Sequence, residues 1–328
     1  MKAIYQTKYG KSDVLEFGEQ ISPRLGEGDI RVKNYAASVN PRDWMIRSGR
    51  YQLQFLVPSF PLILGSDFAG EIIEVGAKVK EFRVGDRVFG MKNPSEGLAT
   101  YANEVVAPAK NIALIPSRLS YTDAASVPLC ALTAWQALVN QSHIKKDMKV
   151  LVVGASGGVG SFAVQIASAL GANVTGVSSQ GNRELVESLG AKKVIDYANQ
   201  DFASGAERYD IIFDTIGKHS LKQCRKVLTK RGVFVSTIPS PANLQAMLLT
   251  SLKSMFMGNK QVAKVVMVKS SGEDLNRVAR MIREKSVRPL IDRVFSLQEA
   301  GVALDYSRSL RAKGKIVLEV NSSPERNA

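Results

Sequence analysis

The sequence predicts an α/β protein that combines a β-rich part with a parallel sheet and crossover helices, and two observations carry this prediction. Up to about residue 125, short runs of β-forming residues are separated by Gly and Pro. From about Ser126, apolar strands alternate with longer helical patterns, which is typical of a parallel sheet. A length of 328 residues, with 45% hydrophobic and 23% charged residues, fits two ordinary globular domains.

The β-rich part consists of short apolar or alternating runs. Each run is bounded by turn-forming residues, as half-buried strands are. Helical periodicity is scarce in this part of the chain. The predicted strands are Ile30–Tyr35, Gly70–Gly76, Asp86–Gly90 and Glu104–Ala107.

The middle of the chain alternates between strand and helix. Because parallel neighbours need a crossover connection, this alternation predicts a doubly wound sheet. Helices are predicted at Gly160–Leu170, Asn182–Leu189 and Ser220–Leu228. Strands are predicted at Lys149–Val153, Asn173–Val177, Lys193–Ile195, Asp210–Phe213 and Gly232–Thr237.

The end of the chain returns to the pattern of its beginning. Val265–Val268 is predicted as the last strand of the parallel sheet, and Gly272–Lys285 as an amphipathic helix. Ile291–Phe295 and Lys315–Val320 are short strands again. We therefore predict one domain from residues 1–125 and 269–328, with a second domain, residues 126–268, inserted between its two halves.

Composition excludes several classes of protein. Two Cys and two His are too few for a disulfide framework or a structural zinc site, so we expect a reducing compartment. No apolar run approaches the ~20 residues that span a bilayer. The N-terminus has the features of neither a signal peptide nor an Arg-rich transit segment, so a cytoplasmic location is expected.

The chain is basic, with 44 Lys plus Arg against 30 Asp plus Glu and a net charge of +14. These cations are spread along the sequence and form no long block of like charge. A solvated basic surface is therefore favoured over a dedicated nucleic-acid or membrane surface, although peripheral membrane contact stays open.

The strongest chemical signal is a glycine-rich turn. The apolar strand Val150–Val153 runs into Gly154-Ala155-Ser156-Gly157-Gly158-Val159-Gly160, and a helical pattern follows at once. Small residues let the backbone approach a pyrophosphate, whose charge the free N–H groups and the helix dipole stabilise. Ala155 stands at the first position of the common G-x-G-x-x-G spacing. We predict a dinucleotide-binding turn, since mere packing of a helix on a sheet needs fewer glycines.

The second strand indicates which dinucleotide is bound. NAD sites usually carry Asp or Glu at the end of this strand, to accept a ribose hydroxyl. Here the strand ends at Ser178 and Ser179, and Arg183 opens the next helix. Hydroxyls and a guanidinium suit a 2′-phosphate, so NADPH is favoured over NADH. The alternative is that Arg183 is merely an exposed helical residue.

Motifs along the whole chain point to a family. They include Ser38-Val39-Asn40-Pro41-Arg42-Asp43, Arg47-Ser48-Gly49-Arg50-Tyr51, Pro61 to Gly70, Val84-Gly85-Asp86-Arg87-Val88, Ala131-Leu132-Thr133-Ala134, Val194-Ile195-Asp196-Tyr197 and Gly314-Lys315-Ile316-Val317-Leu318. With the glycine turn, these motifs resemble the medium-chain dehydrogenase/reductase superfamily, in its zinc-free quinone oxidoreductase branch. The resemblance implies a GroES-like β-rich catalytic domain, a Rossmann domain, an active site in the cleft between them, and commonly a homodimer.

The resemblance also indicates whether a catalytic zinc ion is expected. The alcohol dehydrogenases of this superfamily place a Cys and a Gly-His-Glu segment at a catalytic zinc. Here Asn40 takes the place of that Cys, and Gly65 is followed by Ser66 and Asp67. No metal is therefore expected. Without a Lewis acid, hydride transfer to a conjugated acceptor is easier than oxidation of a simple alcohol, because the charge delocalises onto an oxygen that needs only hydrogen bonds.

The resemblance implies roles for individual residues. Asn40 lies at the nicotinamide and substrate, and Tyr51 lies near the acceptor, where it donates a hydrogen bond or a proton. Asp43 is expected to be structural. The implied cofactor-binding residues are Asn40, Thr133, Gly157, Gly158, Val159, Gly160, Ser178, Arg183, Tyr197, Ile238, Val266, Met267 and Val268. Ordinary core packing remains the alternative for Thr133 and Tyr197.

We therefore expect an NADPH-dependent reductase of small quinones or α,β-unsaturated carbonyls. Two other functions stay open: reduction of an enoyl thioester, and a nucleotide-binding protein that acts through its basic surface on RNA or acidic lipid. The apolar stretch Pro239–Gly258 fits either a pocket wall or a dimer contact.

Overall fold

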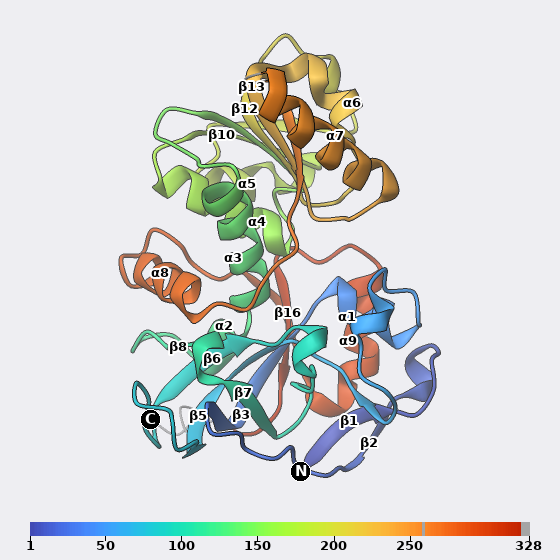
Figure 1. Cartoon of the computed structure of the whole chain (residues 1–328), viewed down its shortest axis with the longest axis vertical. Coiled ribbons are helices and arrows are strands. Elements are labelled where there is room, and N and C mark those ends of the chain that lie inside the picture. The colour runs from blue at the N-terminus through green and yellow to red at the C-terminus, as the bar shows by residue number, and fades with distance from the viewer. Residues whose placement is uncertain (258–259, 323–328) are drawn as a thin grey trace. The chain divides into compact units, whose positions relative to one another are not determined.

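The computed structural model describes residues 1–257 and 260–322, with side chains for all of these except residues 252–257. The chain divides into two compact units (Figure 1). The first unit comprises residues 1–132, 269–283 and 289–328, and the second comprises residues 133–268 and 284–288. The division falls inside helix α3 (Pro128–Trp135), a few residues beyond the predicted boundary at residue 126.

The first unit is built on a large, mostly antiparallel sheet with the strand order β15-β16-β3-β5-β6-β8, and β7 pairs with β3 as well. Because β16 pairs with β3, the last two strands of the chain belong to the same sheet as strands from its N-terminal part. The strands are β3 (Asp29–Val39), β5 (Asp67–Val75), β6 (Arg87–Met91), β7 (Glu104–Pro108), β8 (Ile112–Leu114), β15 (Ile291–Ser296) and β16 (Lys315–Glu319).

A smaller antiparallel sheet and several helices complete the first unit. The sheet has the order β2-β1-β4 and consists of β1 (Lys2–Gln6), β2 (Glu16–Glu19) and β4 (Leu62–Ile63). Alternate residues of the large sheet, among them Ile30, Val32 and Phe68, are buried in a common core. The helices are α1 (Pro41–Arg47), α2 (Tyr121–Ala125), α8 (Gly272–Arg283) and α9 (Ala300–Arg308).

The second unit contains a parallel sheet with the order β11-β10-β9-β12-β13-β14. Helices α4 and α5 lie on one side of this sheet, and α6 and α7 on the other (Figure 1). The strands are β9 (Lys149–Val153), β10 (Asn173–Ser178), β11 (Lys193–Asp196), β12 (Tyr209–Asp214), β13 (Leu228–Ser236) and β14 (Val262–Val265). The helices are α4 (Gly158–Ala169), α5 (Arg183–Ser188), α6 (Leu221–Cys224) and α7 (Pro241–Met257), and a π-helical stretch spans Gln136–Gln141.

Two features differ from the expectations. The last parallel strand is Val262–Val265, so Val266, Met267 and Val268 follow it rather than belong to it. Both Val262–Val265 and Val265–Val268 contain enough apolar residues to form this strand. The pairing of Val233 with Val262 shows that the earlier segment forms it. Most of the apolar stretch Pro239–Gly258, for which the sequence predicted no helix, is helix α7, which packs against β14, and Gly258 lies outside the described residues. Among the described helices, none has both the length and the apolar character needed to cross a membrane.

Candidate functional site

The glycine turn joins β9 to α4 and is tied to the neighbouring strand. Gly154 has a φ of +78°, and the backbone N–H groups of Gly154 and Ala155 both donate to the carbonyl of Val177, at 3.0 Å each. A Cβ on Gly160 would lie 2.0 Å from the carbonyl oxygen of Gly154, so only glycine lets the helix approach the turn this closely. Helix α4 begins at Gly158, and the first N–H groups of a helix have no partner within it. The turn therefore offers backbone donors and a positive helix end to an anion.

The residues expected at the adenosine end lie beside this turn. Ser178 ends β10, and its carbonyl accepts the N–H of Tyr197 at 3.2 Å. The Arg183 side chain is 43% exposed and donates to the carbonyl of Val194 at 3.2 Å, so its guanidinium is steadied without being buried. Tyr197 is 65% exposed, which excludes core packing as its role. Neither β10 nor the segment after it presents an Asp or Glu before Glu184.

Asn182 adds a link that the sequence did not suggest. Its side-chain Nδ2 donates to Ser156 Oγ at 3.0 Å, joining the loop after β10 to the glycine turn. The contact is between side chains on separate loops, so no local pattern reveals it. It holds the two halves of the candidate nucleotide site together.

The residues expected at the nicotinamide end follow β13 and β14. Ser236 connects them, because its Oγ accepts from the Ile238 N–H at 3.2 Å and its carbonyl accepts from the Val266 N–H at 2.9 Å. Met267 is 52% exposed. All parallel strands end at the same edge, so these residues share the carboxyl edge of the sheet with the glycine turn. Thr133 lies in α3 and is 5% exposed, which leaves core packing open for it.

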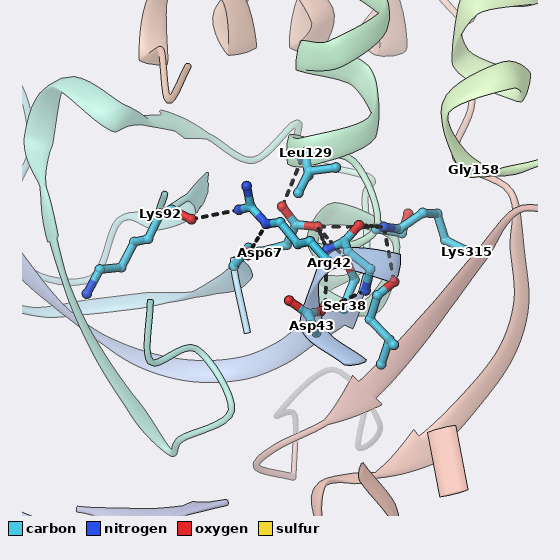
Figure 2. A network of polar contacts seen from close by, with 12 residues as sticks. Ser38, Arg42, Asp43, Asp67, Lys92, Leu129, Gly158 and Lys315 are labelled. Atoms are coloured by element: carbon cyan, nitrogen blue, oxygen red, sulfur yellow. Dashed lines mark hydrogen bonds and ion pairs between the residues drawn. The ribbon is translucent and has the colours of Figure 1, made fainter. Parts of the chain in front are cut away.

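Asn40 lies in the first unit, at the start of α1, inside a buried polar network (Figure 2). Its Nδ2 donates to Asp67 Oδ2 at 2.9 Å, and its Oδ1 accepts from Lys315 Nζ at 2.6 Å. Asp67 Oδ2 also accepts from Ser38 Oγ at 2.6 Å, and Asp67 Oδ1 accepts from the Leu129 N–H at 2.8 Å. The carboxamide of Asn40 is thus fixed in orientation by a carboxylate on one side and an ammonium on the other.

Lys315 and Asp67 form a buried ion pair, with their charged atoms 3.6 Å apart and exposures of 3% and 0%. Both residues occur in the family motifs, Asp67 after Gly65-Ser66 and Lys315 after Gly314. Their motifs are far apart in the chain, so neither a role for these two residues nor their contact could be predicted from the sequence. The pair concentrates one positive and one negative charge at Asn40.

Asp43 has the structural role expected of it. Its Oδ2 accepts from the Asn40 N–H at 2.8 Å, which caps α1, and from Tyr101 Oη at 2.9 Å. Burial raises the pKa of Asp43 to about 6, despite the lowering effect of the Arg42 charge. Arg42 itself donates to Ser66 Oγ at 2.8 Å and to the Lys92 carbonyl at 2.9 Å, which anchors α1 to the large sheet.

Tyr51 is not joined to this network by a hydrogen bond among the contacts of the described residues. It is half-buried, and its ring packs against the apolar cluster that contains Ile46 and Leu64. Asn40 and Tyr51 therefore belong to the same unit, but the structure links only Asn40 to the charged pair.

The comparisons with known proteins agree with this architecture. Residues 26–117 match the family described as "Alcohol dehydrogenase GroES-like domain", and residues 189–318 match the one described as "Zinc-binding dehydrogenase". A mitochondrial NAD(P)H oxidoreductase of Danio rerio is 32% identical, over 98% of this chain and 91% of its own length. The chain belongs to the medium-chain dehydrogenase/reductase superfamily, in its quinone oxidoreductase branch.

Solved structures of this superfamily show the same fold. The quinone oxidoreductase of Coxiella burnetii is 30% identical with a TM-score of 0.88, covering 98% of this chain and 99% of that one. The quinone oxidoreductase of Escherichia coli, solved in complex with NADPH, is 26% identical with a TM-score of 0.81, covering 98% and 100%. This member of the superfamily has a GroES-like β-rich part and a Rossmann-like parallel sheet, as predicted. It is an oxidoreductase of an NAD(P)H-dependent family.

One of the two family descriptions names zinc, so the side chains around Asn40 decide whether this chain could form a zinc site. Among the described residues, no three His, Cys, Asp or Glu side chains are grouped so that they could hold a metal ion. The ammonium of Lys315 already binds the Asn40 oxygen and neighbours Asp67. The described residues around Asn40 therefore do not fit a zinc ligand set.

Proposed function

We propose that the protein is an NADPH-dependent reductase that transfers hydride to quinones or α,β-unsaturated carbonyls without a metal ion. The observation that carries this proposal is the contact between Lys315 and Asn40, beside Asp67. It provides a fixed, oriented hydrogen-bonding group where metal-dependent relatives of this superfamily would need zinc ligands. Two relatives named as quinone oxidoreductases support the choice of acceptor.

The proposed cofactor is NADPH, which supplies a hydride from C4 of its nicotinamide when bound. Gly157, Gly158, Val159 and Gly160 would bind the pyrophosphate through backbone N–H groups, and Ser178, Arg183 and Tyr197 would surround the 2′-phosphate. Support comes from the half-exposed guanidinium of Arg183 and from the absence of a carboxylate at the end of β10. Asn40, Thr133, Ile238, Val266, Met267 and Val268 are the proposed contacts of the nicotinamide and its ribose.

The proposed acceptor-binding residues are Asn40 and Tyr51. The Asn40 carboxamide keeps one lone pair of Oδ1 beyond its bond to Lys315, and it holds a fixed orientation through Asp67. Tyr51 would donate a hydrogen bond or a proton to the acceptor oxygen as negative charge develops there. A conjugated acceptor spreads this charge over several atoms, so hydrogen bonds can stabilise it.

We also propose that the protein works as a homodimer in the reducing environment of the cytoplasm. Cys130 and Cys224 are both buried free thiols, which is compatible with such an environment. An enoyl thioester remains the alternative acceptor, since it too offers a conjugated carbonyl.

A steady-state screen tests the proposed function. Oxidation of NADPH and of NADH would be followed with small quinones, enones, enals and an enoyl thioester, before and after dialysis against a chelator. We expect turnover of quinones or enones with NADPH and no loss after dialysis. Preference for NADH, preference for the thioester, or activity that disappears with the chelator and returns with zinc would each refute the corresponding part of the proposal.

A further inference from the structure

One long segment of the second unit lacks acidic residues. No Asp or Glu occurs between Asp214 and Glu273, although this segment contains many of the basic residues of the chain. The excess of positive charge is thus concentrated by the absence of carboxylates rather than by a block of lysines. The exposed basic residues here include Lys218, Lys222, Arg225, Lys226, Lys230, Arg231 and Lys260.

The elements that carry these cations lie side by side. Leu221 and Cys224 of α6 share one buried cluster with Ala263 of β14, and Ala246 of α7 packs against that cluster, so α6 and α7 cover the same face of the sheet (Figure 1). The side-chain Nε2 of Gln261 donates to the carbonyls of Arg225, Leu228 and Thr229, at 2.9, 3.2 and 3.1 Å. This contact places Lys260 beside the turn that contains Arg225 and the first residues of β13, which include Lys230.

Helix α7, which covers the same face of the sheet as α6, carries exposed apolar side chains. Leu244, Leu248 and Leu249 are 38%, 61% and 48% exposed, while Asn243 and Thr250 face inward and are buried. Leu244 and Leu248 are one helical turn apart, so they lie on the same exposed side of α7. Exposed leucines that flank clustered cations are typical of a surface that contacts a membrane interface.

Few acidic groups counter this charge. Helix η7 (Phe202–Ser204) packs against the turn η8 (Arg225–Val227), and Asp201 precedes it as an exposed carboxylate. Asp214 is buried and bound by the backbone N–H of His219 at 2.7 Å, so it faces inward. The cations therefore outnumber the carboxylates on the described part of this surface.

We propose that this surface, defined by Lys222, Arg225, Lys226, Lys230, Leu244 and Leu248, docks on an anionic lipid bilayer. Anionic headgroups complement the lysines and arginines, at about 1 kcal/mol for each cation near the membrane. The leucines enter the boundary between headgroups and acyl chains. A nucleic acid would bind the same cations but would leave the leucines unused, and the described side chains here include no exposed aromatic ring for base stacking. The proposal is independent of the reaction that the protein catalyses.

Vesicle co-sedimentation of the full chain tests the proposal. We expect binding to phosphatidylcholine vesicles that contain a third phosphatidylglycerol, little binding to phosphatidylcholine alone, and loss of binding at high salt. A variant with Lys222, Arg225, Lys226 and Lys230 changed to Gln should bind about several hundredfold more weakly, since each of the four charges is worth about fivefold. The matched control changes the exposed residues Lys8, Lys11, Lys80 and Lys110 to Gln, which removes the same charge from the first unit and should leave binding unchanged.

A second pair of variants separates the leucines from the charge. Leu248→Gln should weaken binding about tenfold, through lost apolar burial, whereas Val302→Gln, at a 60% exposed site on α9, should not. Unfolding midpoints equal to that of the parent would show that all variants fold.

Several outcomes would overturn the proposal. These are no binding to anionic vesicles, equal weakening by the control variants, or binding of polyuridylate with vesicles left in the supernatant. Conversion of a dimer to a monomer by Leu248→Gln in sedimentation velocity would assign the leucines to self-association and would equally overturn it.

Discussion

Lys315 Nζ lies 2.6 Å from Asn40 Oδ1 and 3.6 Å from Asp67 Oδ2, and all three residues are 3% exposed or less. Burying such an ion pair costs desolvation free energy. Removing one partner destabilises the protein further, because the charge of the other partner is left buried and unpaired. The ion pair also determines which way the Asn40 carboxamide points. Both stability and the proposed acceptor site therefore depend on the same ammonium group.

Lys315→Met should lower the free energy of unfolding by about 3–5 kcal/mol, because Asp67 loses its counter-charge. Urea unfolding measures this change. Lys313→Met, at an exposed position two residues away, should cost less than about 0.5 kcal/mol. If both variants are equally stable, the ion pair does not have the energetic weight assigned to it.

The double variant Lys315→Met with Asp67→Asn separates loss of charge balance from loss of packing. Neutralising Asp67 removes the unpaired charge, and the remaining amide oxygen can still accept from Ser38 and Asn40, although the Leu129 N–H then faces an amide NH2 and loses its acceptor. The double variant should therefore be more stable than Lys315→Met alone, by about 2 kcal/mol. Strict additivity of the two single effects would contradict an ion pair.

Arg183→Ala should raise the KM for NADPH by about tenfold to a hundredfold and leave the KM for NADH nearly unchanged. Hydrogen bonds to charged groups contribute about 1.5–3 kcal/mol, and only NADPH has the 2′-phosphate. Arg208→Ala is the control, because Arg208 is exposed and bonds only to backbone carbonyls of its own loop. An equal rise for both cofactors would point to a structural role of Arg183 through its bond to the Val194 carbonyl.

The local parts of the fold could be predicted from the sequence. Strand β9 has the predicted bounds, and the glycine turn leads into α4 within two residues of the predicted helix start. Apolar strands and glycine turns are predictable because each depends on residues that are close together in the sequence. Helix α7 was missed because Pro239 precedes it and Pro241 is its first residue, and because three of its described leucines, Leu244, Leu248 and Leu249, are exposed rather than part of a buried stripe.

The candidate site was harder to predict, because its contacts are long-range. Asp67 and Lys315 come from separate parts of the chain and meet through the pairing of β3 with β5 and β16, and helix α3 brings the Leu129 N–H to Asp67. The carboxyl edge of the second unit was easier, since parallel strands bring the residues that follow them to one edge. The end of β14 was misplaced because Val265–Val268 is as apolar as the true strand.

Tyr51→Phe should lower kcat by about a hundredfold to ten-thousandfold if the hydroxyl donates a proton to the acceptor. Stability should hold, because the ring keeps its packing against the cluster of Ile46 and Leu64. Tyr5→Phe controls for a lost phenol at an exposed site, where the hydroxyl donates to Glu16 at 2.9 Å. A normal kcat in Tyr51→Phe would show that the Tyr51 hydroxyl is not the proton donor.

Asp43 makes stability depend on pH. Burial raises its pKa from 3.8 to about 6, so the folded protein holds this proton more tightly than the unfolded chain does. The contribution of Asp43 to stability is therefore full below about pH 4 and is lost as the pH rises through about 6. Between these limits, the unfolding free energy of the parent relative to Asp43→Asn should fall by about 3 kcal/mol. Urea unfolding across this range measures the difference, with Asp13→Asn as a control for the lost charge. A difference that is constant with pH would show that Asp43 titrates normally, and that its bonds from the Asn40 N–H and Tyr101 offset its burial.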